Sequence, residues 1–335
     1  MRSYYRPIAQ IDPFRPEDAL PLAGGWTWFD RAERITRGGS ELVKARDIPA
    51  DVLARLTAPR APVAGLTWDA PRLMGILNVT PDSFSDGGQF DTPGAALAQA
   101  RAMAGAGADI IDVGGESTRP GARPVAAEDE TARTAPVIAA IRGALDTPIS
   151  IDTRKAGVAR AAIEAGATLV NDVSGFTFDG GLAPYCASAG LPVCVMHAQG
   201  DPQTMQDAPR YDDVTLDVYD FLEGRVDALV LQGIRRDRII VDPGIGFGKT
   251  LAHNLALLSR LSIFHGLGCA ILLGASRKKF IGTIGGAPEA SGRMPGSVAV
   301  ALAGIAQGVQ IIRAHDVEAT HAAMRLWRAA MTGAA

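Results

Sequence analysis

Residues 73–88 read Leu73-Met74-Gly75-Ile76-Leu77-Asn78-Val79-Thr80-Pro81-Asp82-Ser83-Phe84-Ser85-Asp86-Gly87-Gly88. An apolar run changes at Asn78 into a segment that carries two carboxylates, one amide and three hydroxyls. Pro81 and the Gly87-Gly88 pair are incompatible with a helix and typical of turns. Polar side chains directly after a buried parallel strand favour a functional loop over an ordinary surface turn.

The same change from apolar to polar recurs along the chain, and helical patterns alternate with the apolar runs. Strands are predicted at 73–77, 109–113, 149–152, 168–171, 192–196, 238–241, 270–274 and 309–313. Helices are predicted near 93–105, 127–144, 156–165, 180–189, 212–232, 252–261, 297–307 and 317–331. Eight such units within residues 72–332 predict an α/β fold, a (β/α)8 TIM barrel. A doubly wound open sheet is the alternative, because the number of units does not prove closure.

Residues 1–71 lack this alternation and contain three of the four tryptophans. They are predicted to be an N-terminal extension that packs on the barrel and covers its bottom. Within it, 20–38 is consistent with a small β-hairpin or meander, and 47–56 with a short helix that starts near Asp47 or Pro49. The extension carries no catalytic set of residues, so a separate functional domain is the less favoured reading.

Composition narrows the functional class. The chain has 335 residues, 47% of them hydrophobic and 21% charged, with a net charge of −3. That balance predicts a well-cored protein without the basic field that recruits nucleic acid or an anionic membrane. The odd set Cys186, Cys194 and Cys269 has no metal-type spacing and is typical of buried thiols in a reducing compartment. The N-terminus lacks the apolar core of a signal peptide, so a cytoplasmic location is expected.

Polar residues follow every predicted strand, and in a closed barrel these strand ends meet on one face. Asp152, Asn171 and Asp242 offer acceptors and an amide that suit a flat heterocycle with amino, amide and ring N–H groups. Each could instead cap the helix that follows it. Ser276, Arg277, Arg313 and His315 follow the last two strands, where many barrels bind phosphate. Asn78 could bind a hard cation such as Mg2+ that bridges phosphate oxygens.

Other chemistries find no support in the sequence. The run from Gly244 to Thr250 resembles a phosphate-binding loop, but its required first glycine falls on Pro243. His197, His253, His265 and His321 lack the spacing of a helical metal site, and no Gly-x-Ser-x-Gly nucleophile motif occurs. Covalent catalysis therefore has no evident agent.

The order of these segments resembles the dihydropteroate synthase family. The loops 78–88 and 112–121 look like its two signature segments, and the remaining matching segments are Asp152-Thr153, Asn171-Asp172, Met196-His197, 242–249, 276–278 and 313–316. The resemblance covers roughly residues 72–330. It implies condensation of 6-hydroxymethyl-7,8-dihydropterin pyrophosphate with p-aminobenzoate, with Mg2+ as cofactor and a homodimer as the assembly.

The resemblance also implies roles for single residues. The pterin would be bound by Asp112, Asp152, Asn171, Met196, Asp242, Lys278 and Arg313. The pyrophosphate would be bound by Asn78, Arg313 and His315, with Asn78 also at the metal. The p-aminobenzoate would be framed by Phe84, Thr118, Arg119, Pro120, Phe247 and Ser276. Lys279 departs from the family, in which some members have a serine there that binds the p-aminobenzoate carboxylate. In this chain Lys279 or the N-terminus of the helix would have to bind that carboxylate.

Two alternatives belong to other functional classes. A pterin-binding methyltransferase domain that acts with a corrinoid protein shares the barrel and the pterin pocket. It would lack the chemistry of Phe84, Thr118 and Arg119 and the phosphate residues Arg313 and His315. A non-catalytic barrel that binds a protein partner would leave so complete a set of polar strand ends unexplained.

Overall fold

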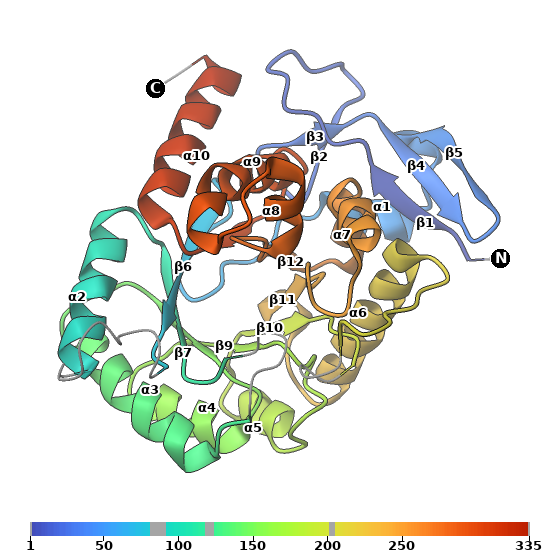
Figure 1. Cartoon of the computed structure of the whole chain (residues 1–335). Coiled ribbons are helices and arrows are strands. Elements are labelled where there is room, and N and C mark those ends of the chain that lie inside the picture. Colours follow the sequence, from blue (N-terminus) through green and yellow to red (C-terminus); the bar gives the residue numbers. More distant parts are fainter. Residues whose placement is uncertain (1, 81–91, 118–123, 201–204, 334–335) are drawn as a thin grey trace.

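Eight parallel strands form a closed barrel, and the helices surround them (Figure 1). The computed structural model describes residues 2–80, 92–117, 124–200 and 205–333. The strand order around the barrel is β10-β11-β12-β13-β6-β7-β8-β9. The bounds are β6 (Arg72–Asn78), β7 (Ile110–Gly114), β8 (Ile149–Asp152), β9 (Leu169–Asp172), β10 (Val193–Met196), β11 (Ile239–Asp242), β12 (Ala270–Leu273) and β13 (Ile311–Ala314). The predicted TIM barrel is thus confirmed, and the open-sheet alternative is wrong.

The helices lie where the 3.6-residue patterns predict them, with one addition. Their bounds are α2 (Thr92–Gly105), α3 (Ala127–Arg142), α4 (Ala156–Glu164), α5 (Leu182–Ser188), α6 (Val214–Leu231), α7 (Leu251–Leu258), α8 (Lys279–Gly285), α9 (Met294–Ile305) and α10 (Val317–Thr332). Helix α8 is absent from the sequence prediction, because its seven residues include Gly282 and Gly285 and glycine is a weak helix former.

The barrel interior is built in two layers, because alternate residues of a strand face the same side. The lower layer is apolar and includes Ile110, Leu169, Cys194, Ile240 and Ile311 in one buried cluster. The upper layer lies two residues further along each of these strands. Its inward-facing residues are Asp112, Asn171, Met196, Asp242 and Arg313. The fold therefore places the polar residues together at the carboxyl ends of the strands.

The N-terminal extension contacts the side of the barrel and its bottom. Its three-stranded antiparallel sheet has the order β1-β4-β5, formed by β1 (Tyr4–Pro7), β4 (Arg31–Thr36) and β5 (Gly39–Lys44), and packs beside α6 and α7 (Figure 1). Tyr4 Oη donates to Asp220 Oδ1 of α6 at 2.8 Å. The short strands β2 (Leu20–Pro21) and β3 (Trp28–Phe29) and helix α1 (Ala50–Thr57) complete it.

Only the end of the extension reaches the barrel bottom. Val63 and Trp68 join the lower apolar layer, and Trp68 is 5% exposed. The small hairpin predicted within 20–38 is present as the antiparallel pair of β2 and β3. A second, longer hairpin, which joins β4 to β5, extends beyond that range. Pro49 lies at the N-cap of α1, as predicted. The predicted covering of the bottom therefore applies to this final segment, while the sheet covers the side.

Deleting residues 1–68 is expected to lower the melting temperature while leaving the Michaelis constants of the surviving enzyme near normal. Truncation of a buried tryptophan alone costs roughly 3–5 kcal/mol of unfolding free energy. Trp68→Ala should therefore reproduce part of the loss, measured by calorimetry. A truncated protein that melts normally yet is inactive would show instead that the extension serves the active site.

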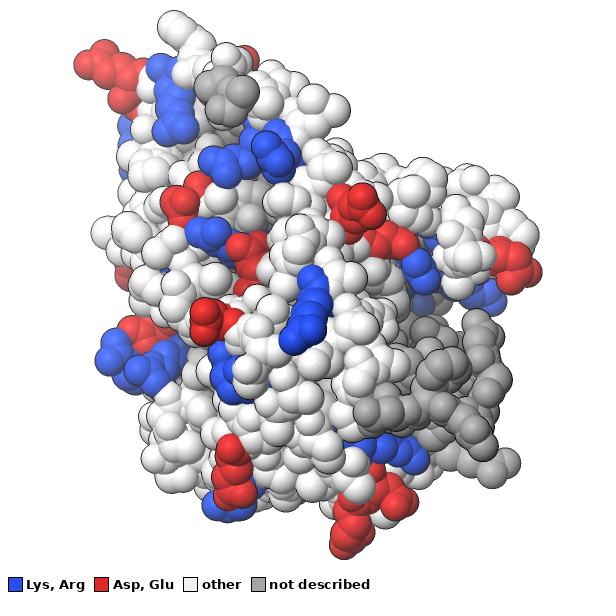
Figure 2. All heavy atoms as spheres, turned by 90° about the vertical axis from the view of Figure 1, so that its left-hand side faces the viewer, with Lys and Arg blue, Asp and Glu red and all other residues white. Residues whose placement is uncertain are grey.

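Acidic and basic side chains are intermixed on the face shown in Figure 2. No helix in the described ranges is long and apolar enough to cross a membrane. All three cysteines are buried and free, as predicted.

Candidate active site

A row of side chains crosses the carboxyl ends of four neighbouring strands. Asn78 of β6 pairs in register with Gly114 of β7, Gly114 with Asp152 of β8, and Asp152 with Asn171 of β9. A Cβ atom on Gly114 would lie 3.8 Å from both Asn78 Oδ1 and Asp152 Oδ2. Glycine at this position therefore leaves room between the amide and the carboxylate at the barrel mouth.

Arg313 of β13 is held by two carboxylates from β7 and β8, which lie two and three strands away around the barrel. Its Nε donates to Asp112 Oδ2 at 2.6 Å, and its Nη2 donates to Asp152 Oδ2 at 2.8 Å. Asn171 Nδ2 also donates to Asp112 Oδ2, at 3.3 Å. Asp112 Oδ1 is buried with no hydrogen-bond partner among the described residues. An acceptor left open in this way is suited to an N–H donor of a ligand.

Burial and the neighbouring charges shift the pKa values of Asp152 and Arg313. Burial raises the pKa of Asp152 to about 7, opposed by Arg313 and reinforced by Asp112. Arg313 stays charged, because the attraction of Asp112 and Asp152 outweighs burial and raises its pKa. The site therefore holds a permanent cation beside a carboxylate that titrates near neutral pH.

Asp242, Lys278 and Phe247 form the other half of the mouth. Asp242 Oδ1 accepts from Gly244 N at 2.7 Å, and Lys278 Nζ donates to Ile245 O. The same ammonium nitrogen lies 4.2 Å from the centroid of the Phe247 ring. Burial lowers the pKa of Lys278 to about 7, with Asp242 opposing the shift and Arg313 adding to it. Burial likewise raises the pKa of Asp242.

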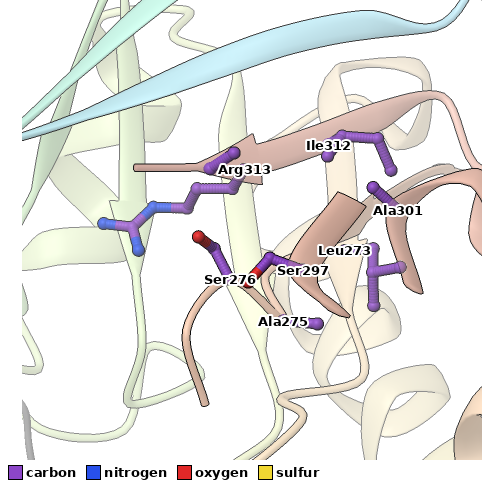
Figure 3. A pocket seen from close by; sticks show the side chains of 8 residues that line it. Leu273, Ala275, Ser276, Ser297, Ala301, Ile312 and Arg313 are labelled. Atoms are coloured by element: carbon purple, nitrogen blue, oxygen red, sulfur yellow. The ribbon is translucent and has the colours of Figure 1, made fainter. Parts of the chain in front are cut away.

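Ser276 and His315 meet at the ends of β12 and β13. His315 Nδ1 and Ser276 Oγ are 3.0 Å apart. The neighbouring residues Arg277 and Asp316 form an ion pair, with Arg277 Nε donating to Asp316 Oδ2 at 2.9 Å. Figure 3 shows Arg313, Ser276 and Ser297 around a cavity of about 10 Å3. A cavity of this size holds one water molecule at most, so it is too small to receive a substrate.

The helix-capping alternative is wrong for the three polar strand ends. Helices α4, α5 and α7 have Lys155, Gly181 and Thr250 at their N-caps. Across the mouth, Asp152 instead accepts from Arg313 and Asn171 donates to Asp112. Asp242 accepts from the backbone N–H of Gly244 in the loop that follows its own strand.

The residues that form this site lie within the span of a known protein family. The family model described as "Pterin binding enzyme" matches residues 74–315. A dihydropteroate synthase of Synechocystis sp. is 45% identical over 285 residues, covering 83% of this chain and 99% of the relative. The chain belongs to the dihydropteroate synthase family. Its members are transferases.

Solved structures of the dihydropteroate synthase family have the same fold. The Xanthomonas albilineans enzyme with 4-aminobenzoic acid matches with a TM-score of 0.77 and 45% identity, covering 81% of this chain and 98% of the other. The same enzyme in complex with 7,8-dihydropteroate matches with a TM-score of 0.74 and 41% identity, over 81% and 98% of the two chains. Residues 1–73 lie outside the span of the family model.

The structure brings together most of the residues that the resemblance implies for the dihydropteroate synthase site. Asp112, Asp152, Asn171 and Arg313 are in direct contact. Met196 pairs in register with Asp242. Phe84, Thr118, Arg119 and Pro120 lie outside the described residues. Their assigned contacts with p-aminobenzoate stay predictions, as do the ligand roles of the others.

Two residues of functional interest were missed by sequence reasoning. Both lie in segments that resemble the family, Met196-His197 and 242–249, but the sequence assigns neither of them a role. In the structure Lys249 Nζ is 2.8 Å from His197 Nδ1. No local pattern signals a contact between residues that lie 52 positions apart.

Lys278→Met is expected to change how stability depends on pH. Lys278 titrates at about 7 in the folded chain and near 10.5 when unfolded. Between these values the unfolded chain holds a proton that the folded chain lacks, so raising the pH favours folding. The wild-type free energy of unfolding should therefore rise more steeply from pH 7 to 10 than that of Lys278→Met. Lys279→Met, at the exposed neighbouring position, is the control, and equal slopes for Lys278→Met and wild type in urea titrations would contradict the assignment.

Proposed function

We propose that this chain condenses 6-hydroxymethyl-7,8-dihydropterin pyrophosphate with p-aminobenzoate to give 7,8-dihydropteroate and pyrophosphate in folate biosynthesis. The observation that carries the proposal is the largely buried cluster of Arg313, Asp112 and Asp152 at the barrel mouth, in which Asp112 is fully buried. The relatives of the chain are named dihydropteroate synthases.

The pterin is proposed to lie over the upper layer of the barrel. Asp112 Oδ1 has an open acceptor position, and Asp152 and Asp242 supply further carboxylates for amino and ring N–H groups. Asn171 and Lys278 supply donors for the carbonyl and ring nitrogens. Met196 follows the apolar lower layer and offers a soft contact surface to the ring.

The pyrophosphate is proposed to bind beside Asn78, Arg313 and His315. Arg313 suits this role because its guanidinium stays charged and is already fixed by two carboxylates. A resident Mg2+ fits the donor set, since Mg2+ is usually held by one or two protein oxygens together with substrate phosphates. The Asn78 amide oxygen and Asp152 Oδ2 both lie beside Gly114 at the barrel mouth. When bound, Mg2+ supplies charge neutralisation at the pyrophosphate oxygens.

The p-aminobenzoate is proposed to lie between Phe247 and Ser276, with Phe84, Thr118, Arg119 and Pro120 closing the pocket. Phe247 is already fixed in place by the ammonium of Lys278 against its ring. Lys279 is exposed at the start of α8, whereas the preceding Arg277 is paired with Asp316 and Lys278 donates to Ile245 O. Lys279 is therefore proposed to face the carboxylate of p-aminobenzoate in place of the family serine.

The reaction requires no protein nucleophile. The bond between the pterin methylene carbon and the pyrophosphate oxygen breaks, and the electron pair leaves with pyrophosphate. The electron-rich pterin delocalises the resulting cation, the aniline nitrogen forms the new C–N bond, and that nitrogen releases one proton to the leaving group or solvent. The protein contributes charge stabilisation at the mouth and positions the amine.

The experiment is an assay of pyrophosphate release by the purified full-length chain. Release is expected only when the pterin pyrophosphate, p-aminobenzoate and Mg2+ are all present. Release that does not need p-aminobenzoate would identify a hydrolase instead. The methyltransferase alternative is not favoured, because Arg313 and His315 are both present at the mouth.

Binding is expected to be ordered, with p-aminobenzoate following the pterin pyrophosphate. The p-aminobenzoate pocket is proposed to include groups from the loops that follow β6 and β7, which need the bound anion as a partner. Calorimetric titration of p-aminobenzoate should show weak binding to the bare enzyme and tighter binding with pyrophosphate and Mg2+ present. Equally tight binding in both cases would contradict an ordered mechanism.

The assembly is proposed to be a homodimer in the cytoplasm. Leu251 and Leu255 lie one turn apart on α7 and are each 42% exposed, and Ile284 on α8 is 59% exposed. Such side chains favour burial against a second copy. The free cysteines fit a reducing compartment. A molecular mass of one chain in analytical ultracentrifugation would rule out the homodimer. Recovery of the protein outside the cytoplasmic fraction would rule out the cytoplasmic location.

A further inference from the structure

Lys249 is a buried lysine that no step of the proposed reaction uses. It lies between β11 and α7 and is 3% exposed. Its Nζ contacts Gly244 O at 2.8 Å, Phe247 O at 3.0 Å and His197 Nδ1 at 2.8 Å. These partners are backbone carbonyls and an imidazole rather than carboxylates, so a simple buried ion pair does not account for the residue.

We propose that Lys249 is a positioning residue for pterin recognition: its side-chain nitrogen fixes the loop after β11 so that this loop holds Lys278 beside Asp242. The inference rests on the proposed function, because it assigns Lys249 to the pterin pocket of that reaction.

The first step of the argument is what the loop carries. Ile245 O accepts from Lys278 Nζ, and the Phe247 ring lies 4.2 Å from the same nitrogen. Both groups belong to residues 244–247, whose first and last carbonyls are the ones that Lys249 binds. Releasing these two carbonyls would therefore release the surface against which Lys278 is aligned.

The second step is that this loop conformation is tightly constrained. Gly244 has φ +66°, and a Cβ atom there would lie 1.8 Å from His197 O. Gly246 has φ +83°, and a Cβ atom there would lie 2.8 Å from Lys278 Cδ. The loop backbone thus passes directly between the end of β10 and the Lys278 side chain, where few other conformations fit.

The third step is that Lys249 satisfies its partners in either protonation state. Burial, with the nearby charge of Lys278, lowers the pKa of Lys249 well below its ordinary value. An ammonium donates to both carbonyls and to His197 Nδ1, and a neutral amine donates to the carbonyls and accepts from the imidazole. The His197 ring is in turn packed edge-on against Phe221, with ring centroids 4.8 Å apart, so the imidazole is a fixed anchor.

The test is a double-mutant cycle on the affinity of the full-length protein for 6-hydroxymethyl-7,8-dihydropterin pyrophosphate without p-aminobenzoate. Lys249→Met should weaken binding at least tenfold, because methionine keeps the length of the side chain and removes its donors. In a Lys278→Met background the same change should cost less than twofold, since Lys249 acts through Lys278. An equal loss in both backgrounds, or no loss in the wild-type background, would overturn the inference.

Two further sets of variants separate positioning from general destabilisation. Leu229→Ala removes a fully buried side chain of α6 that has no part in the site, and it should lower the melting temperature without changing affinity. A matching loss of affinity in Leu229→Ala would overturn the inference. If Lys249→Met does not fold, His197→Asn keeps an acceptor near the Nδ1 position and should bind normally, whereas His197→Leu should bind at least tenfold more weakly. Equal affinities in that pair would overturn it too.

The wild-type protein, measured in parallel, separates this inference from the proposed function. A wild type that does not bind the pterin pyrophosphate overturns both. A wild type that binds, together with a Lys249→Met variant that binds equally well, overturns the inference alone.

Discussion

Arg313→Met is expected to lower kcat/KM for the pterin pyrophosphate at least about 100-fold, and to destabilise the fold. Removing one partner of a buried ion pair costs roughly 3–5 kcal/mol of unfolding free energy, because the remaining charge is left uncompensated. Here two carboxylates, Asp112 and Asp152, lose their common cation. The substrate pyrophosphate loses a charge partner as well.

Steady-state kinetics and urea unfolding measure the two effects of Arg313→Met separately. Arg325→Met, on the exposed face of α10 in the same strand–helix unit, is the matched control and should behave as wild type. Arg313→Lys keeps the positive charge but loses the forked guanidinium that binds both carboxylates. Its kcat/KM and its free energy of unfolding should therefore lie between those of wild type and Arg313→Met. A wild-type kcat/KM in Arg313→Met would contradict the proposal that Arg313 belongs to the substrate-binding site.

Asp152→Asn and Asp242→Asn are each expected to weaken pterin binding by about 1.5–3 kcal/mol, the value of a hydrogen bond to a charged acceptor. Both carboxylates lie at strand ends in the upper layer of the barrel, and both are shielded from water. Asparagine preserves the shape of the side chain, so the fold should survive.

Calorimetric titration with the pterin pyrophosphate measures the loss in each aspartate variant. Asp129→Asn, at an exposed position of α3, is the control and should leave affinity unchanged. The loss for Asp152→Asn should shrink as the pH falls below about 7, where the wild-type carboxyl also becomes neutral. Unchanged affinity of both variants for the pterin pyrophosphate would contradict the assignment of the pterin pocket.

The barrel could be predicted because its strands are covered on both faces. A run such as Ile239-Ile240-Val241 is apolar at every position, and each such run ends in a polar residue that the core cannot use. Closure of the sheet then brings Asp112, Asp152, Asn171 and Asp242 to one face. The gathering of polar strand ends could thus be predicted from local sequence combined with one topological rule. Their assignment to a pterin rests on the resemblance to the family.

The elements that escaped prediction depend on distant contacts. Strand β1 contains Tyr4, Tyr5, Arg6 and Pro7, and its structure comes from antiparallel pairing with β4, about thirty residues further along the chain. The ion pair of Arg313 with Asp112 joins residues 201 positions apart, so its existence follows only from the closed barrel. Lys249 was overlooked for the same reason, since its partner His197 lies on a different strand end.

The most direct test of the proposed activity is identification of the product by mass spectrometry. The full-length chain would be incubated with 6-hydroxymethyl-7,8-dihydropterin pyrophosphate, Mg2+ and p-aminobenzoate labelled with 15N at its amine. We expect a single new species with the mass of 7,8-dihydropteroate that retains the 15N label, formed in equal amount to pyrophosphate and strongly reduced in Arg313→Met. Recovery of unlabelled hydroxymethyl-dihydropterin as the only pterin product, with p-aminobenzoate unchanged, would contradict the proposal.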